Sequence, residues 1–277
     1  MGENFKNSLS TRYILNKCAP LIAFFLFIPP FAYAETLNTR FAYVGDIENT
    51  AYMGVVQGLD EANHQGEFLG LKYSIDVIPK ANTKLDGYLA ILVDADQKTL
   101  LKIASANPDT PVFNLTSKDD QLRTSCINNL LHTIPSNRML QDAEKQWQTK
   151  TPDSKAKAEA WHPDFVKFAA RDLNKRFFKS HKQKMDSNAW AGWAAVKMTS
   201  NTVANTKITD SADMLKYLKT ELLFDGQKGE DMRIRETGQL SQPLLLIEND
   251  KIVAEAPVRG VAKPPTLDSL GILHCKK

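Results

Sequence analysis

The sequence has few of the residues and motifs on which enzymes and metal sites depend. Only 3 cysteines and 5 histidines occur among its 277 residues. It contains no Gly-x-Ser-x-Gly, Walker, Gly-x-Gly-x-x-Gly, Cys-x-x-Cys or His-x-x-x-His pattern. These absences argue against a nucleophile elbow, a nucleotide-binding loop and a spaced pair of metal ligands. We therefore predict a protein that is not an enzyme, with no catalytic residues, no cofactor and no metal.

A long apolar run is found only near the N-terminus, from Ala19 to Phe31. Arg12 and Lys17 precede this run, and the small-x-small triplet Ala32-Tyr33-Ala34 follows it. A positive start, an apolar stretch and such a triplet, in that order, are typical of a cleavable secretory signal peptide. We predict that residues 1–34 are this signal peptide and that the mature protein is periplasmic.

An uncleaved membrane anchor is the alternative interpretation of the same run. The run has about a dozen residues, whereas an apolar helix needs roughly 20 to cross a bilayer. Pro29-Pro30 also interrupts it, and proline breaks helices. We therefore expect no stable membrane insertion after cleavage.

Positive and negative charges are nearly balanced, with 35 lysine and arginine residues against 32 aspartate and glutamate residues. Nucleic-acid-binding surfaces need a concentrated positive field. The balance therefore argues against a nucleic-acid partner.

The cysteines predict one crosslink. Cys18 leaves with the signal peptide, so Cys126 and Cys275 remain as a pair. Paired thiols in an oxidising compartment usually form a disulfide. Two buried free thiols are the alternative.

Residues 35–148 alternate apolar runs of strand length with amphipathic stretches of helix length. This alternation is typical of βαβ units and a parallel sheet. The predicted strands are 41–44, 73–78, 88–93, 111–115 and 130–134, and the predicted helices are 53–66, 100–107 and 137–147, the last capped by Ser136. We predict an α/β fold in which these residues form one Rossmann-like, doubly wound N-terminal lobe.

The second half of the chain has a different character. Residues 149–160 are polar and predict a linker or the solvated start of a helix. Residues 161–277 predict helices followed by a C-terminal β-hairpin and a tail that pack on the N-terminal lobe. The predicted helices begin at Pro163, at Asp186 or Ser187 and at Ala212; residues 232–235 predict a strand, and the hairpin strands 244–248 and 251–254 flank Asn249-Asp250. Phe165, Phe168, Trp190 and Trp193 recur at helical spacing and are expected in the core.

Polar side chains follow three of the predicted strands. They are Asp46, Asp94, and the pair Thr116 and Ser117. Ligands of open α/β sheets bind at the carboxyl ends of the strands, so we predict that these four residues bind a small solute. Polar strand ends are also common because loops face water. A hydrolytic enzyme that uses Asp46, Asp94 and Asp96 as acid and base is a weaker alternative.

Several phrases, taken together and in this order, resemble a known family. They are Cys126-Ile127-Asn128-Asn129-Leu130-Leu131-His132-Thr133, Ala160-Trp161-His162-Pro163-Asp164-Phe165, Trp190-Ala191-Gly192-Trp193-Ala194-Ala195-Val196-Lys197, Phe224-Asp225-Gly226-Gln227-Lys228-Gly229, Gly238-Gln239-Leu240-Ser241-Gln242-Pro243 and Leu267-Asp268-Ser269-Leu270-Gly271. The chain is similar to the type I periplasmic substrate-binding proteins, of the branched-chain amino-acid-binding class, that accompany PQQ-dependent alcohol dehydrogenase systems.

The resemblance implies two Rossmann-like lobes with a solute held between them. It also implies a role beside a quinoprotein dehydrogenase and an ABC permease as partners, without catalysis by this chain. Hydroxyls and backbone amides after the fourth strand hold the solute in that class, and these map onto Thr116 and Ser117.

One departure from the family concerns the second lobe. Several βα units of that lobe are replaced here by residues 148–160. We therefore expect a type I periplasmic-binding-protein-like fold with a truncated second lobe. A lone lobe would leave a solute half exposed, since good pockets bury about 70 to 90 per cent of a ligand. Docking of a protein, as an assembly factor for a quinoprotein dehydrogenase without a small ligand, is the alternative function.

Overall fold

A five-stranded parallel sheet forms the centre of the computed structural model, which describes residues 36–80 and 82–276. The predicted signal peptide lies outside the described residues. The strand order is β2-β1-β3-β4-β5. This is a doubly wound order, in which β2 lies on one side of β1 and the later strands are added on the other side. The strands are β1 (Leu37–Val44), β2 (Leu71–Val77), β3 (Ala90–Val93), β4 (Val112–Asn114) and β5 (Leu130–His132).

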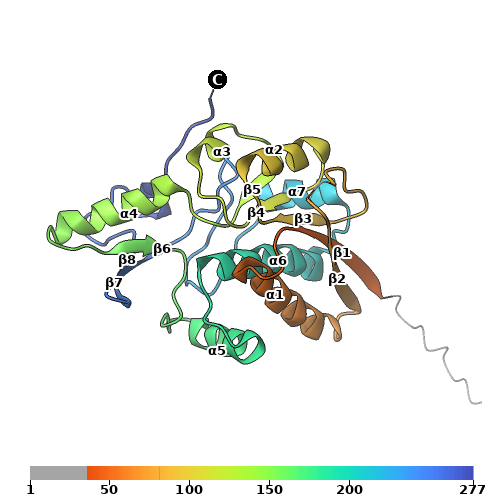
Figure 1. Cartoon of the computed structure of the whole chain (residues 1–277), viewed down its shortest axis with the longest axis horizontal. Coiled ribbons are helices and arrows are strands. Elements are labelled where there is room, and N and C mark those ends of the chain that lie inside the picture. Colours follow the sequence, from red (N-terminus) through yellow and green to blue (C-terminus); the bar gives the residue numbers. More distant parts are fainter. Residues whose placement is uncertain (1–35, 81, 277) are drawn as a thin grey trace, which may run out of the picture. The chain divides into compact units, whose positions relative to one another are not determined.

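Helices cover both faces of this sheet, as Figure 1 shows. Phe41 and Tyr43 pack among side chains of α1 (Thr50–Gly66) and α6 (Ser187–Thr206), whereas Ala42 and Val44 pack against α2 (Gln97–Ala106). Successive strand side chains point to opposite faces, so a continuous apolar strand supplies both cores. The remaining helices are α3 (Asp120–Thr124), α4 (Asn137–Lys150), α5 (Ala170–His181), α7 (Ser211–Thr220) and the 3-10 turn η1 (Leu267–Ser269).

Glycines bring α1 and α6 into direct backbone contact. A Cβ atom on Gly54 would lie 1.8 Å from the carbonyl oxygen of Ala189, and one on Gly192 would lie 2.2 Å from that of Ala51. Any side chain at either position would therefore force the helices apart. This close crossing anchors α6, which comes from the second half of the chain, onto the N-terminal lobe.

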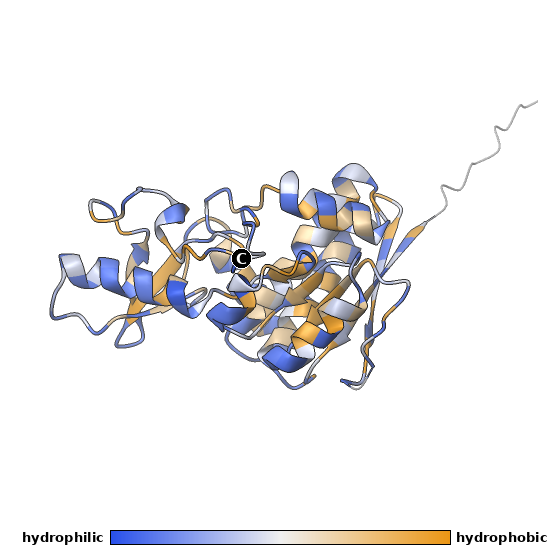
Figure 2. Cartoon of the chain, turned by 90° about the horizontal axis from the view of Figure 1, so that it is seen from above, coloured by the Kyte–Doolittle hydropathy of each residue, from blue (hydrophilic) through white to orange (hydrophobic). Residues whose placement is uncertain are grey.

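The second lobe is reduced to a small antiparallel sheet and one helix. Strands β6 (Lys157–Glu159), β7 (Leu244–Glu248) and β8 (Lys251–Ala256) pair in the order β6-β7-β8. Helix α4 packs against this sheet and is largely hydrophilic on the side visible in Figure 2, in contrast to the strands. The predicted α/β fold with a truncated second lobe is confirmed.

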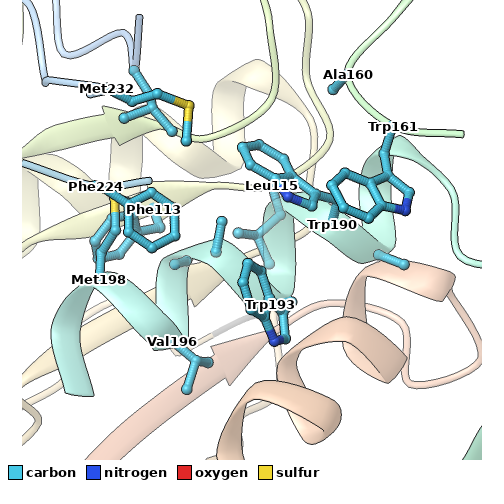
Figure 3. Close-up of a cluster of buried hydrophobic side chains, with 14 of the residues drawn as sticks. Phe113, Leu115, Ala160, Trp161, Trp190, Trp193, Val196, Met198, Phe224 and Met232 are labelled. Carbon is cyan, nitrogen blue, oxygen red and sulfur yellow. The ribbon is translucent and has the colours of Figure 1, made fainter. Parts of the chain in front are cut away.

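Aromatic side chains form the core at the junction of α6 with the C-terminal segments (Figure 3). The rings of Trp161 and Trp190 stack with their centroids 6.1 Å apart. The ammonium group of Lys228 lies 3.7 Å from the centroid of the Trp190 ring. Lys228 is buried and donates to Oε1 of Gln242 and to the carbonyl oxygen of Pro243, and burial lowers the pKa of its amine well below the usual value. The expectation that Trp190 and Trp193 belong to the core is confirmed.

Three local predictions are wrong. Residues 157–159, expected in a linker, form β6, which pairs with the hairpin; the hairpin also packs on α4. The helix predicted from Pro163 begins at Ala170; Phe168, at its boundary, has a positive φ of 53° and is exposed. Residues 232–235 make only isolated bridges, because their partners belong to irregular segments.

Capping and turn signals are confirmed. The hydroxyl of Ser136 accepts from the backbone N–H of Met139 at the start of α4, and Asp186 caps α6 in the same way. Asn249 and Asp250 both have positive φ, as a two-residue hairpin turn requires.

A disulfide joins Cys126 to Cys275, so the predicted crosslink is present. The tail before Cys275 is also held by Arg235, whose guanidinium donates to the carbonyl oxygens of Leu267 and Leu270 at 2.7 Å each. The C-terminal tail is thus fixed to the body by covalent and polar contacts.

Among the helices that the structure describes, none is long and apolar enough to cross a membrane.

Candidate functional site

The carboxyl edge of the five-stranded sheet brings the predicted site residues of two strands together. Asp94 follows β3, and Thr116 and Ser117 follow β4. The Thr116 hydroxyl donates to Oδ1 of Asp94 over 2.8 Å. Asp94 is only 9% exposed, so little of this carboxylate reaches solvent.

Asp46 follows β1 at the same edge but is exposed. Its Oδ1 accepts from the backbone N–H of Glu48 at 2.9 Å, and its carbonyl oxygen accepts from the Tyr43 hydroxyl at 3.0 Å. Burial raises the pKa of Tyr43, and the nearby carboxylates of Asp94 and Asp46 raise it further. Tyr43 therefore remains a neutral hydrogen-bond donor that fixes the loop after β1.

Asn114, at the end of β4, organises the loop that carries Thr116 and Ser117. Its Oδ1 accepts from the backbone N–H groups of Ser117 at 2.9 Å and Thr116 at 3.3 Å. Its Nδ2 donates to the carbonyl oxygen of Ser117 at 2.7 Å. The two backbone amides that the family resemblance assigns to a solute are thus used within the loop, and the hydroxyls are left to face outward or toward Asp94.

The buried His132 side chain contacts Asn114. Nδ2 of Asn114 lies 3.0 Å from Nδ1 of His132. Burial, with a smaller effect of the Arg123 charge, lowers the pKa of His132 well below its usual value, so the ring is neutral. Because Nδ1 accepts from Asn114, we assign the ring proton to Nε2. No hydrogen-bond partner for Nε2 occurs in the described part of the chain.

Arg123, in α3, holds the same loop from below. It is fully buried and donates to the carbonyl oxygens of Ser117, Asp119 and Ile134, at 2.8 to 2.9 Å. Its Nε donates to Oε1 of Gln239. Burial lowers the pKa of Arg123 to about 9, which still leaves it charged at neutral pH. The loop after β4 is therefore pre-organised by a cation that forms no ion pair with any of the described carboxylates.

Asp96, the third carboxylate of the hydrolytic alternative, is exposed and accepts a local hydrogen bond. It caps α2, and Oδ1 accepts from the backbone N–H of Thr99 at 2.8 Å. This hydrogen bond lowers the pKa of Asp96. An exposed, stabilised carboxylate is unsuited to general acid catalysis near neutral pH, since such an acid needs a raised pKa.

Strand β6 contributes a half-buried carboxylate near this loop. Burial raises the pKa of Glu159 above its usual value, and the charges of His162 and Lys118 act against this effect. Lys118 directly follows Ser117. The small second sheet thus places a half-buried carboxylate within electrostatic range of Lys118, which directly follows the predicted site.

Cavities of about 300 to 600 Å³ lie elsewhere on the surface, and none of these is lined by Asp46, Asp94, Thr116 or Ser117. In residues 36–80 and 82–276, no group of three His, Cys, Asp or Glu side chains could hold a metal ion. The predicted site is therefore an open edge with two carboxylates and two hydroxyls.

Solved structures with the same fold are ligand-binding proteins of ABC transporters. A branched-chain amino acid ABC transporter periplasmic ligand-binding protein from Burkholderia xenovorans is 13% identical, over 78% of this chain and 95% of that one, with a TM-score of 0.67. An ABC transporter substrate-binding protein from Desulfitobacterium hafniense, in complex with leucine, is 12% identical over 78% and 98%, with a TM-score of 0.61.

A third similar structure is the branched-chain amino acid transporter substrate-binding protein of Streptococcus pneumoniae in complex with isoleucine. It is 10% identical, over 80% of this chain and 99% of that one, with a TM-score of 0.59. No protein-family model matches the chain, and no curated protein matches its sequence. At these identities the likeness concerns the fold, which is that of the type I periplasmic binding proteins.

Proposed function

We propose that the chain is a non-enzymatic periplasmic binding protein of an ABC-type system and that it binds a small solute carrying an amino group. The observation that carries this proposal is the pairing of Asp94 with Thr116 at the carboxyl edge of a type I binding-protein sheet. Ligands of open α/β sheets bind at this edge. Related folds hold leucine and isoleucine in the Desulfitobacterium and Streptococcus proteins.

The chemistry of the edge suits an amine. In the described chain, Asp94 and Asp46 form no ion pair with lysine, arginine or histidine. An ammonium group would supply the missing positive charge, and the hydroxyls of Thr116 and Ser117 are neutral hydrogen-bonding groups for the rest of the solute. The phrases shared with the family of the PQQ-dependent alcohol dehydrogenase systems support a place beside a quinoprotein dehydrogenase.

Thermal unfolding in a panel of amino acids, amines, short alcohols, aldehydes and carboxylates tests the proposal. We expect saturable stabilisation by an amine-bearing solute, about 2.7 kcal/mol at a hundredfold excess over the dissociation constant. Asp94→Asn should abolish this stabilisation, whereas Asp153→Asn, at an exposed position outside the edge, should retain it. A folded protein with a flat panel would contradict the proposal.

A second candidate function is protein docking, as an assembly factor for a quinoprotein dehydrogenase. Two observations favour it: the amides of Thr116 and Ser117 are already bonded to Asn114, and the second sheet has only three strands. In that case no small solute would be captured. Co-purification with the dehydrogenase should then survive in the Thr116→Ala, Ser117→Ala double variant, and loss of the complex in that variant would argue against a solute-free docking role.

A further inference from the structure

An apolar groove runs beside α5, well separated in sequence from the strand-edge site. Its volume is about 320 Å³, and its apolar lining consists of Pro163, Val166, Phe178 and Met185. Val166 is 50% exposed and Phe178 is 53% exposed, although side chains of this kind are usually buried. The groove therefore presents apolar surface that the described part of the chain leaves uncovered.

The walls of this groove are held together before any ligand arrives. Asn174, on the same face of α5, donates from Nδ2 to the carbonyl oxygens of Pro163 at 2.8 Å and Phe165 at 3.0 Å. Its Oδ1 accepts from Nε1 of the buried Trp161 at 2.8 Å. A rigid groove loses little conformational entropy on binding, which favours affinity.

Three cations line the groove: Arg171 and Lys175 from α5, and Lys184 from the segment that follows α5. Within residues 36–80 and 82–276, none of the three forms an ion pair, whereas Lys167 and Arg176 nearby are paired with Glu255 and Glu61.

Carboxylates are scarce around these cations. Asp164 is the only acidic residue among the described residues that line the groove. Positive charge thus exceeds negative charge around an apolar floor.

We propose that this groove binds amphipathic carboxylates, molecules with an unbranched apolar chain and one carboxylate head. The chain would cover Val166 and Phe178, because removing apolar surface from water favours binding. The head would pair with Lys175, Lys184 or Arg171, since guanidinium and ammonium groups are the usual partners of carboxylates. The groove shares no residue with the strand-edge site, so a failed test of one proposal leaves the other unaffected.

Isothermal titration calorimetry with decanoate, below its micelle concentration, tests this inference on the intact protein. We expect saturable binding of one decanoate per chain. Decanol, which keeps the tail and lacks the charge, should bind at least about tenfold more weakly, and acetate should not bind measurably. Equal affinities for decanoate and decanol, or the absence of saturation by decanoate, would overturn the proposal.

Paired variants place the binding in the groove. Lys175→Gln with Lys184→Gln should weaken decanoate binding at least about tenfold, a difference of 1.4 kcal/mol. Lys179→Gln with Lys182→Gln, at exposed positions that do not line the groove, should leave it unchanged. Thermal unfolding of both variants checks that they fold. An equal loss of decanoate affinity in the two double variants would indicate non-specific attraction and would refute the site. Displacement of bound decanoate by an acidic peptide, but not by other unbranched carboxylates, would also refute it.

Discussion

The Cys126–Cys275 disulfide should contribute a large part of the stability of this protein. The two cysteines are 149 residues apart in sequence. In the chain-entropy model, closing a loop of this length removes about 5 kcal/mol of conformational freedom from the unfolded state. Reduction should therefore destabilise the protein mainly by freeing its unfolded chain.

Polar contacts of the tail persist after reduction, so the folded structure should survive it. Arg235 holds the carbonyl oxygens of Leu267 and Leu270, and Oδ2 of Asp142 accepts from the backbone N–H of Gly271 at 2.8 Å. Urea unfolding with and without dithiothreitol measures the difference. With a slope of about 2.5 kcal/mol per molar urea, the unfolding midpoint should fall by about 2 M.

The control is the Cys126→Ser, Cys275→Ser double variant. It should unfold like the reduced protein, and dithiothreitol should not change its midpoint. A reduced protein within about 1 kcal/mol of the oxidised protein would refute the reasoning, since the loop-closure contribution would then be absent. A double variant far less stable than the reduced protein would show that sulfur packing, not loop closure, dominates.

Three further predictions concern packing and the buried polar groups. Gly54→Ala should lower the free energy of unfolding by at least about 2 kcal/mol, because its Cβ would meet the Ala189 carbonyl oxygen at 1.8 Å. Gly58→Ala, whose Cβ would meet Val196 at 3.0 Å, should lower this free energy less. Equal losses of the two variants in chemical denaturation would contradict the account. His132 is neutral in the fold, whereas an unfolded histidine gains its proton near pH 6.5. Acidification below about pH 6.5 should therefore reduce the free energy of unfolding by up to about 1.4 kcal/mol per pH unit from this group. An NMR titration in which the His132 ring of the folded protein protonates near pH 6.5 would refute this. Asn114→Ala leaves the Ser117 amide without its acceptor and should cost about 1 to 3 kcal/mol in urea unfolding; an unchanged midpoint would show that water replaces the side chain.

Regular periodicity made much of the fold predictable. Strands β3 and β4 are buried throughout and β3 is a continuous apolar run, whereas the edge strand β2 alternates buried and exposed residues. Helices α1, α2 and α4 carry apolar residues at helical spacing. Ser136 and Asp186 were informative because capping is a local interaction. These signals depend only on neighbours in sequence.

Elements stabilised by distant partners were not predictable in the same way. Strand β6 has no apolar run, since Ala158 is its one buried residue, and it exists because it pairs with β7, almost ninety positions away. Phe165 and Phe168 suggested a helix by spacing, yet Phe168 takes a left-handed conformation before α5 begins. Tertiary contacts overrode the local pattern in both places.

The candidate site was predicted in part. The rule that ligands gather at strand ends pointed to Asp94 and Thr116, which the structure joins by a hydrogen bond; that they bind a solute stays a prediction. Asn114, Arg123 and Gln239 were missed because their roles depend on contacts across long sequence separations, 116 positions in the case of Arg123 and Gln239. A buried arginine within a polar helix leaves no signal in periodicity.

Calorimetric titration of an amine-bearing solute into the protein tests the central claim most directly. We predict one saturable site per chain for at least one amino acid, at least about tenfold weaker binding in Asp94→Asn, a loss of 1.4 kcal/mol or more, and unchanged binding in Asp153→Asn. The absence of heat of binding for every amino acid, in a protein whose unfolding is cooperative, would contradict the claim that the edge formed by Asp94 and Thr116 is a solute site.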